Sequence, residues 1–275
     1  CGDGRREGRE QCDDANIIET DSCRNSCRSA RCGDGVVYAA QEHCDDANAE
    51  NNDDCKNDCT LHLPSASLGG THSCFHRQGK VWCSGYGYHG ALGNGANVDS
   101  AVPVPVLGLT DVTQTAAGYY HHCALRENGS VMCWGYGAHG QLGQGAWSST
   151  NRPVEVRNLG DVVELNASHY TTCARKRDGS VWCWGYNYWG DLGIGHNGGR
   201  NTPQRVLDLD GATELSGGVH HHCALIEGGR VKCWGRGTYR QVTNTGQEPE
   251  RVVRPVLVPN IVGAEQLVSG GYSNC

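Results

Sequence analysis

The stretch Cys123-Ala-Leu-Arg-Glu-Asn-Gly-Ser-Val-Met-Cys133-Trp-Gly135 decides the fold of this chain, because it recurs about every fifty residues. It returns at Cys173–Gly185 and Cys223–Gly235, and in a looser form at Cys74–Gly85. Every copy has two cysteines that bracket an apolar run, a glycine-containing turn and a second apolar run. Repetition at this period is typical of a repeat architecture rather than of a set of unrelated domains.

Each copy of this stretch predicts a β-hairpin. In the second copy, residues 121–126 and 130–134 flank a three-residue turn, residues 127–129, whose glycine can adopt the positive φ that such a loop requires. If Cys123 and Cys133 face each other across the two strands, they can reach disulfide distance at a non-hydrogen-bonded pair. Closing so short a loop contributes roughly 2–3 kcal/mol in the chain-entropy model.

The same argument predicts one disulfide in each hairpin. The predicted pairs are Cys74–Cys83, Cys123–Cys133, Cys173–Cys183 and Cys223–Cys233. The first hairpin is one residue shorter between its cysteines, which predicts a two-residue turn at Gln78 and Gly79. The chain has 17 cysteines in all. So many cysteines indicate disulfides and hence an oxidising compartment, so we expect a secreted, extracellular or cell-surface protein.

Two further strands are expected in every copy. A glycine-rich segment such as residues 135–145 follows the hairpin, and Pro-x-x-Val strands follow it at Pro153–Val156, Pro203–Val206 and Pro255–Val258. Another strand such as Val162–Asn166 comes next. The glycine spacing resembles that of a nucleotide-binding loop but lacks the βαβ context, so the glycines are expected to serve tight turns and close strand packing.

The fourth copy departs from this pattern. Residues 236–243 replace its Gly-x-Leu-Gly segment, which predicts a loop of different shape.

These repeats resemble the RCC1 family of seven-bladed β-propellers. The resemblance rests on the core His-x-Cys-Ala-Leu…Gly-x-Val-x-Cys-Trp-Gly…Gly-x-Leu-Gly-x-Gly…Pro and covers about residues 68–275. It implies an all-β fold with an RCC1-like propeller region over residues 63–275, containing four repeats and the start of a fifth. Because Cys275 aligns with Cys223, whose partner follows ten residues later, we expect the repeats to continue beyond it as part of seven blades.

Residues 1–60 form a small, acidic, cysteine-rich region with 15 acidic and 7 basic residues. The pattern CGDG…E-x-CDD-x-N…D-x-C…C occurs twice, which predicts one unit over residues 1–31 and a second over residues 32–62. Units of this size cannot bury a sufficient core, so disulfides or a metal must stabilise them. Four cysteines per unit allow three connectivities, which the sequence leaves open. The pattern resembles the myxobacterial-type disulfide-rich repeat and, more loosely, the Lin-Notch-type modules of secreted metalloproteases.

Each of these units gathers the hard oxygen ligands that calcium prefers, and calcium is the only cofactor that the sequence suggests. The candidate ligands are Glu10, Asp13, Asp14, Asn16 and Asp21 in the first unit and Glu42, Asp45, Asp46, Asn48 and Asp53 in the second. The alternative is that these side chains cap backbone amides in turns and need no ion. Zinc is disfavoured, because the Cys-x3-Cys pairs have no histidine nearby.

Aromatic residues on the predicted propeller loops are the candidate partner-binding surface. They are Tyr119, Tyr120, Tyr136, Tyr186, Tyr188 and Trp189. By contrast, Trp134, Trp184 and Trp234 are expected to pack in the blade cores. Histidines at positions 121–122 and 221–222 could bind a transition metal, but the third copy has threonines there, which favours a structural role.

Several function classes are disfavoured by what the sequence contains. There is no nucleophile elbow, no His-Glu-x-x-His motif and no convincing pair of carboxylates, so we predict that the protein is not an enzyme. Residues 61–275 carry 15 acidic and 16 basic residues without a basic stripe, which disfavours nucleic acid as a partner. No run approaches the roughly 18 apolar residues of a membrane span.

The leading interpretation is a secreted or cell-surface bacterial protein with a binding or structural role. Its propeller loops would contact a protein partner or a second copy of the chain. The alternative is a secreted inhibitor of an extracellular enzyme, because an RCC1-like propeller is known to bind and block β-lactamase. Guanine-nucleotide exchange, as in the nuclear RCC1 protein, is opposed by the disulfides and by the absence of a basic tail.

Overall fold

The computed structural model describes residues 65–242 and 249–273, together with positions 11–13, 18, 23, 29 and 37. The chain divides into two compact units, one of Cys1–Pro64 with Arg77–Gly79 and one of Ser65–His76 with Lys80–Cys275. Within the part of the chain that the structure describes, no helix is long and apolar enough to cross a membrane.

In the first unit, a disulfide joins Cys12 to Cys23, the second and third cysteines of the first short repeat. Cys23 also forms an isolated antiparallel bridge with Ser29. Of the ten proposed calcium ligands, Asp13 is among the described residues and the other nine lie outside them.

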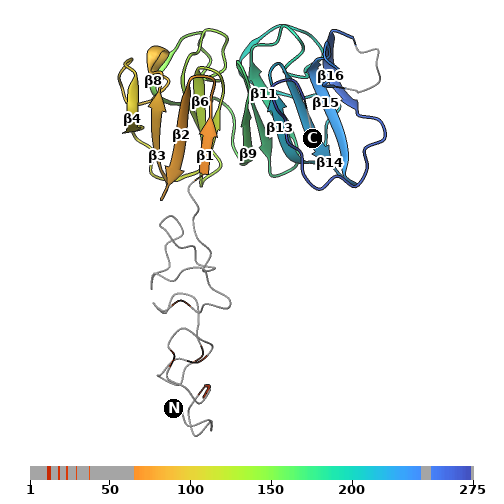
Figure 1. Ribbon diagram of the computed structural model, residues 1–275. Helices are drawn as coiled ribbons and strands as arrows, with labels where there is room; N and C mark the ends of the chain where they lie inside the picture. The colour runs from red at the N-terminus through yellow and green to blue at the C-terminus, as the bar shows by residue number, and fades with distance from the viewer. Residues whose placement is uncertain are drawn as a thin grey trace. The chain divides into compact units, whose positions relative to one another are not determined.

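The second unit consists of four four-stranded antiparallel sheets, one per long repeat, with the strands of each sheet in chain order (Figure 1). Blade one comprises β1 (Ser65–Leu68), β2 (His72–Arg77), β3 (Lys80–Gly85) and β4 (Ser100–Pro105). The short 3-10 helix η1 (Tyr88–Gly90) precedes β4. Blade two comprises β5 (Val112–Ala117), β6 (His121–Arg126), β7 (Val131–Gly135) and β8 (Thr150–Glu155). Blade three comprises β9 (Val162–Ala167), β10 (Thr171–Lys176), β11 (Val181–Gly185) and β12 (Arg200–Arg205), and blade four comprises β13 (Ala212–Gly218), β14 (His221–Ile226), β15 (Arg230–Arg236) and β16 (Arg251–Leu257). The predicted all-β fold of propeller blades is confirmed.

The predicted hairpin turns are confirmed between the second and third strands of each blade. In blade two, the backbone N–H of Arg126 donates to the carbonyl of Ser130 at 3.0 Å, and Gly129 has a φ of 77°. In blade one, Gln78 and Gly79 both have positive φ, 51° and 70°, as a two-residue type I′ turn requires.

Facing cysteines join the two strands of every hairpin. Cys123 lies opposite Cys133 with a Cα–Cα distance of 4.1 Å, which is the close spacing of a non-hydrogen-bonded pair. The disulfides in the structure are Cys74–Cys83, Cys123–Cys133, Cys173–Cys183 and Cys223–Cys233.

The fourth strands begin earlier than the sequence predicted. β8 starts at Thr150 rather than Pro153, because its pairing with β7 extends back to the Gly135–Thr150 pair. Likewise, β12 begins at Arg200 rather than Pro203, and β16 begins at Arg251 rather than Pro255. Val156 follows the strand instead of belonging to it, and its side chain is buried in the core.

The prediction of a differently shaped loop in the fourth copy is wrong as far as Val242. The N–H of Arg240 donates to the carbonyl of Gly237 at 3.0 Å, which is the bond that Gly140 makes to Gly137 in blade two. Arg240 adopts a φ of 63°, so an arginine replaces a glycine at a left-handed position without changing the turn. Val242 is buried as the leucines of the other copies are.

The predicted packing of the tryptophans in blade cores is confirmed, and the structure adds that each completes the core of the preceding blade. Trp134 of blade two lies in the core of blade one, Trp184 in that of blade two and Trp234 in that of blade three, all with 0% exposure. Glycines make room for them. A Cβ on Gly143, which has a φ of 67°, would lie 2.8 Å from Nε1 of Trp184.

The first strands of neighbouring blades are joined by side chains that bond to the backbone of the next blade. The Gln114 amide donates to the carbonyl of Leu165 at 3.0 Å and accepts from its N–H at 2.9 Å. In the next blade, Oε1 of Glu164 accepts from the N–H of Leu215 at 2.8 Å. A side chain at one repeat position therefore sets the register between successive first strands.

We expect Trp184→Ala to lower the free energy of unfolding by about 3–5 kcal/mol, because it removes a fully buried indole from the contact between two blades. Urea denaturation of the oxidised protein measures this change. Trp147→Ala is the matched control, since Trp147 is 53% exposed and its loss should change stability by about 0.5 kcal/mol or less. Equal effects of the two substitutions would contradict the role given to Trp184.

Candidate protein-interaction face

Two loops of each blade lie next to each other at one end of the sheet. In blade two, Tyr119 and Tyr120 form the loop between β5 and β6, and Tyr136 begins the loop after β7. The N–H of Tyr136 donates to the carbonyl of Tyr120 at 2.9 Å. The same bond joins Tyr186 to Tyr170 in blade three at 2.9 Å. Aromatic residues at two separate repeat positions are therefore brought together by the backbone of blades two and three.

The rings on these loops form one continuous network of contacts across the blades, which we name the aromatic belt. Its members are Tyr86, Tyr88, His89, Tyr119, Tyr120, Tyr136, His139, His169, Tyr170, Tyr186, Tyr188, Trp189 and His220. All six aromatic residues proposed as the partner-binding surface lie in it. His139 of blade two links blades two and three, because its ring centroid lies 5.6 Å from that of Tyr136 in blade two and 5.3 Å from that of Tyr186 in blade three.

Sequence reasoning missed more than half of the belt. Tyr86 precedes the equivalent Tyr136 and Tyr186 by one and two repeats, and Tyr170 aligns with Tyr120. The repeat alignment carried this signal. The histidines carried it too, because His89 and His139 align with Trp189, His169 with Tyr119 and His220 with Tyr120.

The belt combines exposed rings with half-buried ones. Tyr88 is 55% exposed, Tyr188 46%, and Tyr86 and Tyr119 37% each, while the other rings are half-buried. Tyrosine offers a large rigid contact area together with one hydroxyl group, which is the chemistry enriched at protein interfaces.

Burial shifts the pKa values of several belt residues in the direction that favours their neutral forms. Burial lowers the pKa of His169 to about 4, with smaller contributions from His220 and His139. Burial also lowers the pKa of His139. The pKa values of Tyr120 and Tyr170 are raised, chiefly by desolvation and then by neighbouring tyrosines. His169 is therefore uncharged at neutral pH.

Positive charge is concentrated at the blade-four end of the belt. The guanidinium of Arg251 lies 4.0 Å from the ring centroid of Tyr188, and that of Arg236 lies 4.5 Å from the ring centroid of Trp189. Stacked arginines of this kind keep their donors available to a carboxylate on a partner.

A buried carboxylate fixes the same end of the belt from beneath. Oδ2 of Asp191 accepts from the backbone N–H of Trp189 at 3.1 Å, and Oδ1 lies 3.1 Å from Nδ1 of His220. Burial raises the pKa of Asp191, and the hydrogen bond from His220 opposes this shift. The backbone carbonyl of Asp191 accepts from Nε1 of Trp234 at 2.9 Å. One residue thus connects the blade core to the loop that carries Trp189.

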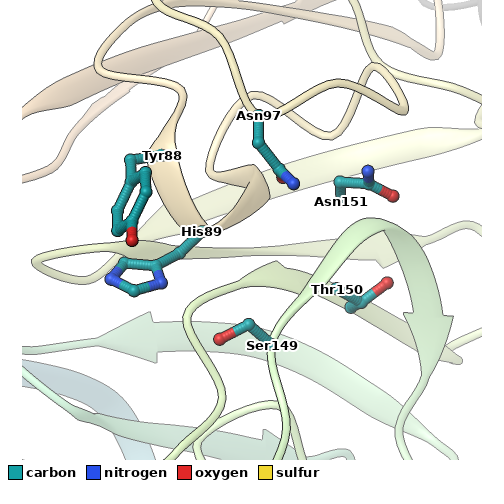
Figure 2. A pocket seen from close by; sticks show the side chains of 6 residues that line it. All are labelled: Tyr88, His89, Asn97, Ser149, Thr150 and Asn151. Atoms are coloured by element: carbon teal, nitrogen blue, oxygen red, sulfur yellow. The ribbon is translucent and has the colours of Figure 1, made fainter.

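A groove of about 440 Å³ extends the belt at the junction of blades one and two (Figure 2). It is lined by Tyr88, His89, Asn97, Ser149, Thr150 and Asn151. Tyr88 and His89 come from η1, Ser149 directly precedes β8, and Thr150 and Asn151 begin that strand (Figure 2). The lining adds amide and hydroxyl groups to the aromatic surface.

The paired histidines that precede the cysteines are buried structural groups. Nε2 of His121 lies 2.9 Å from the hydroxyl oxygen of Thr172. That hydroxyl donates its single proton to the carbonyl of Gln141 at 3.0 Å, so His121 is the donor to Thr172. His122 stacks on Trp134 with ring centroids 5.2 Å apart. These contacts support the expected structural role.

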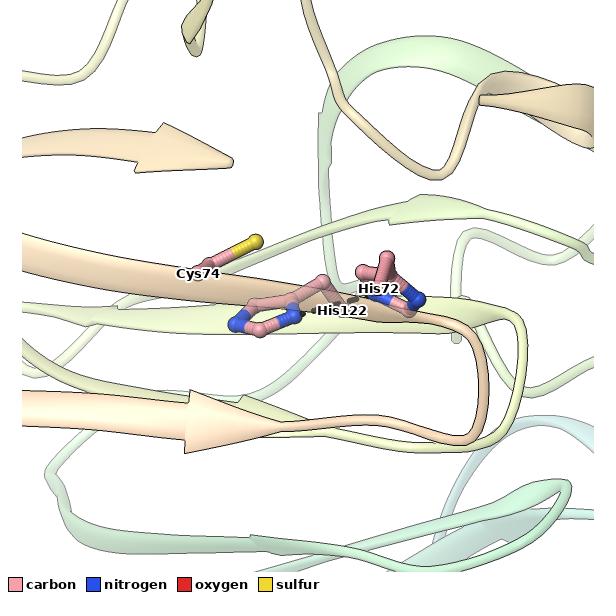
Figure 3. Close-up of side chains that lie close together, drawn as sticks. All are labelled: His72, Cys74 and His122. Atoms are coloured by element: carbon pink, nitrogen blue, oxygen red, sulfur yellow. Dashed lines mark hydrogen bonds between the residues drawn. The ribbon is translucent and has the colours of Figure 1, made fainter. Parts of the chain in front are cut away.

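His72, Cys74 and His122 form the one cluster of potential metal ligands among the described residues (Figure 3). The sulfur of Cys74 is bonded to Cys83. Nε2 of His122 lies 2.8 Å from Oγ of Ser67, and its Nδ1 lies 3.3 Å from Nε2 of His72. With a disulfide sulfur and both nitrogens of one imidazole already engaged, the cluster lacks the three free donors of a typical site.

Comparisons with known proteins agree with this architecture. Models of the Regulator of chromosome condensation (RCC1) repeat match residues 78–125, 128–175 and 178–225, and a second model of the repeat matches residues 112–141 and 162–190. No curated protein matches the chain.

Solved structures resemble the chain at 21–22% sequence identity, which is informative about the fold alone. A chain of the yeast complex of Kap60 with RCC1 (Prp20) has a TM-score of 0.68 at 21% identity, with 76% of this chain and 52% of that chain covered. Human WBSCR16 has a TM-score of 0.67 at 22% identity, covering 76% and 57%. Prp20p from Saccharomyces cerevisiae has a TM-score of 0.66 at 21% identity, covering 76% and 54%. The chain therefore spans little more than half the length of these structures.

We expect the protein to lose stability as the pH falls from about 6.5 towards 4. Burial lowers the pKa of His72 to about 4 and those of His121 and His222 to about 3. Between these values and the ordinary value of 6.5, the unfolded chain binds more protons than the folded one, so the free energy of unfolding decreases with falling pH. Each such histidine contributes about 1.4 kcal/mol per pH unit.

Urea denaturation at a series of pH values measures this slope. His222→Thr is the matched variant, because the third repeat carries Thr172 at the same position. This substitution should reduce the slope of the unfolding free energy against pH by the contribution of one histidine, about 1.4 kcal/mol per pH unit. A slope that is the same in both proteins would contradict the assignment.

Proposed function

Since the chain belongs to the RCC1 repeat family, we propose that it is a non-enzymatic protein-binding module whose contact surface is the aromatic belt. The observation that carries this proposal is the continuity of the belt. Rings from four successive blades touch one another on loops, and His169 among them is neutral at neutral pH. Such a surface offers large contact area at a low desolvation cost, which suits a protein partner.

The structural neighbours support protein binding as the general role. One is yeast RCC1 (Prp20) in a structure with Kap60, and the description of another reports its binding to Gsp1p and histones. Those partners belong to those proteins. For this chain we propose a partner that covers Tyr119 and Tyr188 with apolar side chains and places a carboxylate near Arg251.

We further propose that the protein acts outside the cell, as a secreted or surface-attached bacterial protein. Five disulfides among the described residues are compatible with an oxidising compartment. In this arrangement the acidic region of residues 1–60 serves as a spacer for the propeller. The partner is then an extracellular protein or a second copy of this chain, and inhibition of an extracellular enzyme is the alternative role.

The belt is tested by the double substitution Tyr119→Ala and Tyr188→Ala. Proteins that bind the wild-type chain are first captured from the extracellular fraction of its source, and the affinity of a purified partner is then measured for each variant. We expect a loss of about tenfold or more per tyrosine, because exposed aromatic residues at the centre of an interface dominate binding. Trp147→Ala serves as the control, since this exposed residue lies outside the belt.

Unchanged affinity of the double variant would contradict the proposal. Sedimentation of the wild-type chain at increasing concentration identifies a second copy as the partner. If the captured partner is an enzyme whose activity falls on binding, the inhibitor role replaces the structural one.

Calcium binding by residues 1–60 is a further proposal, supported by the repeated carboxylates of the sequence. Removing calcium with a chelator should lower the melting temperature of this region and leave the propeller transition in place, because a bound ion stabilises only the unit that holds it. Differential scanning calorimetry with and without chelator distinguishes the two transitions. A melting temperature of residues 1–60 that does not change would contradict calcium binding.

A further inference from the structure

Arginine replaces tyrosine at one repeat position of the aromatic belt. In blade three, Tyr186 follows the Trp-Gly pair and contacts His139 of blade two, with ring centroids 5.3 Å apart. In blade four, Arg236 follows the same pair, and its guanidinium lies 4.5 Å from the ring centroid of Trp189 in blade three. The contact between neighbouring blades is therefore kept, and a positive charge is added to this face.

A second arginine lies directly opposite the first. Arg251 in β16 is the pairing partner of Arg236 in β15, so both side chains leave the same face of the sheet. At the position equivalent to Arg251, one residue before the partner of the glycine that ends the third strand, the other blades carry Asp99, Ser149 and Gly199. Like charges that face each other across two strands destabilise a sheet. An anion between them would remove this cost.

Aromatic rings hold both guanidinium groups in place. The guanidinium of Arg251 lies 4.0 Å from the ring centroid of Tyr188 and 5.6 Å from that of Trp189. The guanidinium of Arg236 lies 4.5 Å from the ring centroid of Trp189 and 5.0 Å from that of Tyr239. Stacking uses the flat face of a guanidinium and leaves the N–H donors at its edge available. Because the rings restrict these side chains before a ligand arrives, less entropy is lost on binding.

Most donors of the two arginines have no acceptor within the protein. Nε of Arg236 donates to Oγ1 of Thr238 at 3.2 Å, while Nε of Arg251 is buried without a hydrogen-bond partner. Among the described residues, no carboxylate forms an ion pair with either arginine. By contrast, Arg254 on the same strand pairs with Asp208 at 2.8 Å. Blade four therefore presents two adjacent positive charges that the described part of the chain does not neutralise.

The arrangement of two forks selects among anions. A carboxylate has two oxygens in one plane, and a single guanidinium can bind both of them. A phosphate or sulfate monoester has three terminal oxygens that point in different directions, so it can accept hydrogen bonds from two guanidiniums at once. The chain as a whole carries a net charge of −7, so any attraction for an anion must come from this local pair.

We propose that Arg236 and Arg251 form a binding site for a tetrahedral oxyanion, which the partner carries as a phosphate or sulfate monoester. This inference rests on the proposed function, because the partner that covers the aromatic belt brings the anion to its blade-four end. It narrows the chemistry of that partner. One carboxylate would satisfy the fork of Arg251 alone, whereas an oxyanion with three oxygens also uses that of Arg236.

The test titrates the oxidised 275-residue chain with sodium phosphate, sodium sulfate or sodium acetate at neutral pH and constant ionic strength. NMR follows the Nε1 proton of Trp189, whose ring contacts both arginines. Phosphate and sulfate should shift this signal to saturation and bind about tenfold or more tightly than acetate, because acetate uses only one fork. The Nε1 proton of Trp147, which lies outside the belt, should not shift.

Two substitutions that borrow residues from other repeats remove the charges. Arg236→Tyr introduces the residue that blade three carries as Tyr186, and Arg251→Ser introduces the one that blade two carries as Ser149. Each should weaken phosphate binding about tenfold or more, since one fork is lost. Arg254→Gln is the matched control, because it removes an arginine of the same strand that is already paired with a carboxylate. It should leave the dissociation constant of phosphate unchanged.

Methyl phosphate and methyl sulfate then distinguish a phosphorylated partner from a sulfated one, and tighter binding of either supports the proposal. Acetate that binds as tightly as phosphate overturns it, as does phosphate binding that survives both substitutions. The titrations contain no partner protein, so their failure leaves the proposed function in place. Anion binding together with an unchanged partner affinity of the Tyr119→Ala and Tyr188→Ala double variant would contradict the proposed function and leave the anion site in place.

Discussion

The bond from a tryptophan indole to a backbone carbonyl of the preceding blade is the contact on which the rest of the structure depends. It places a large apolar side chain between two sheets, and the carbonyl accepts the only N–H of the indole. The side chain is therefore buried with its single polar group hydrogen-bonded. The accepting carbonyls belong to Ala91, Gln141 and Asp191, which lie in the loops that also carry His89, His139 and Trp189. The core contact between blades therefore also positions the aromatic rings at the surface.

Local spacing was enough to predict much of this fold. The turn at residues 127–129, the facing cysteines and the buried tryptophans follow from side-chain alternation and from glycine at a left-handed position, which are properties of short segments. The early start of β8 was missed, because it depends on pairing with β7 across a long loop. The unchanged turn at Arg240 was missed for a different reason. An arginine can adopt positive φ where the surrounding bonds determine the conformation, and sequence alone does not show this.

The candidate site was predictable in its members more than in its arrangement. Tyr136 and Tyr186 were found because they lie on loops, but their connection through His139 depends on the angle between two blades. The lowered pKa of His169 likewise depends on its burial and on His220 and His139, which belong to two other blades. Repeat alignment would have added Tyr170. Contacts between repeats, which no single repeat encodes, decide the chemistry of the surface.

Solvent exchange of the indole protons, followed by NMR on the oxidised chain, tests the central claim most directly. The account predicts that the Nε1 protons of Trp134, Trp184 and Trp234 exchange far more slowly than that of Trp147, which is 53% exposed. Slow exchange of all three would show that the same hydrogen bond holds each indole in the core of the preceding blade. Exchange at the rate of Trp147 would contradict the account, since blades joined in another way would leave the indoles accessible to water.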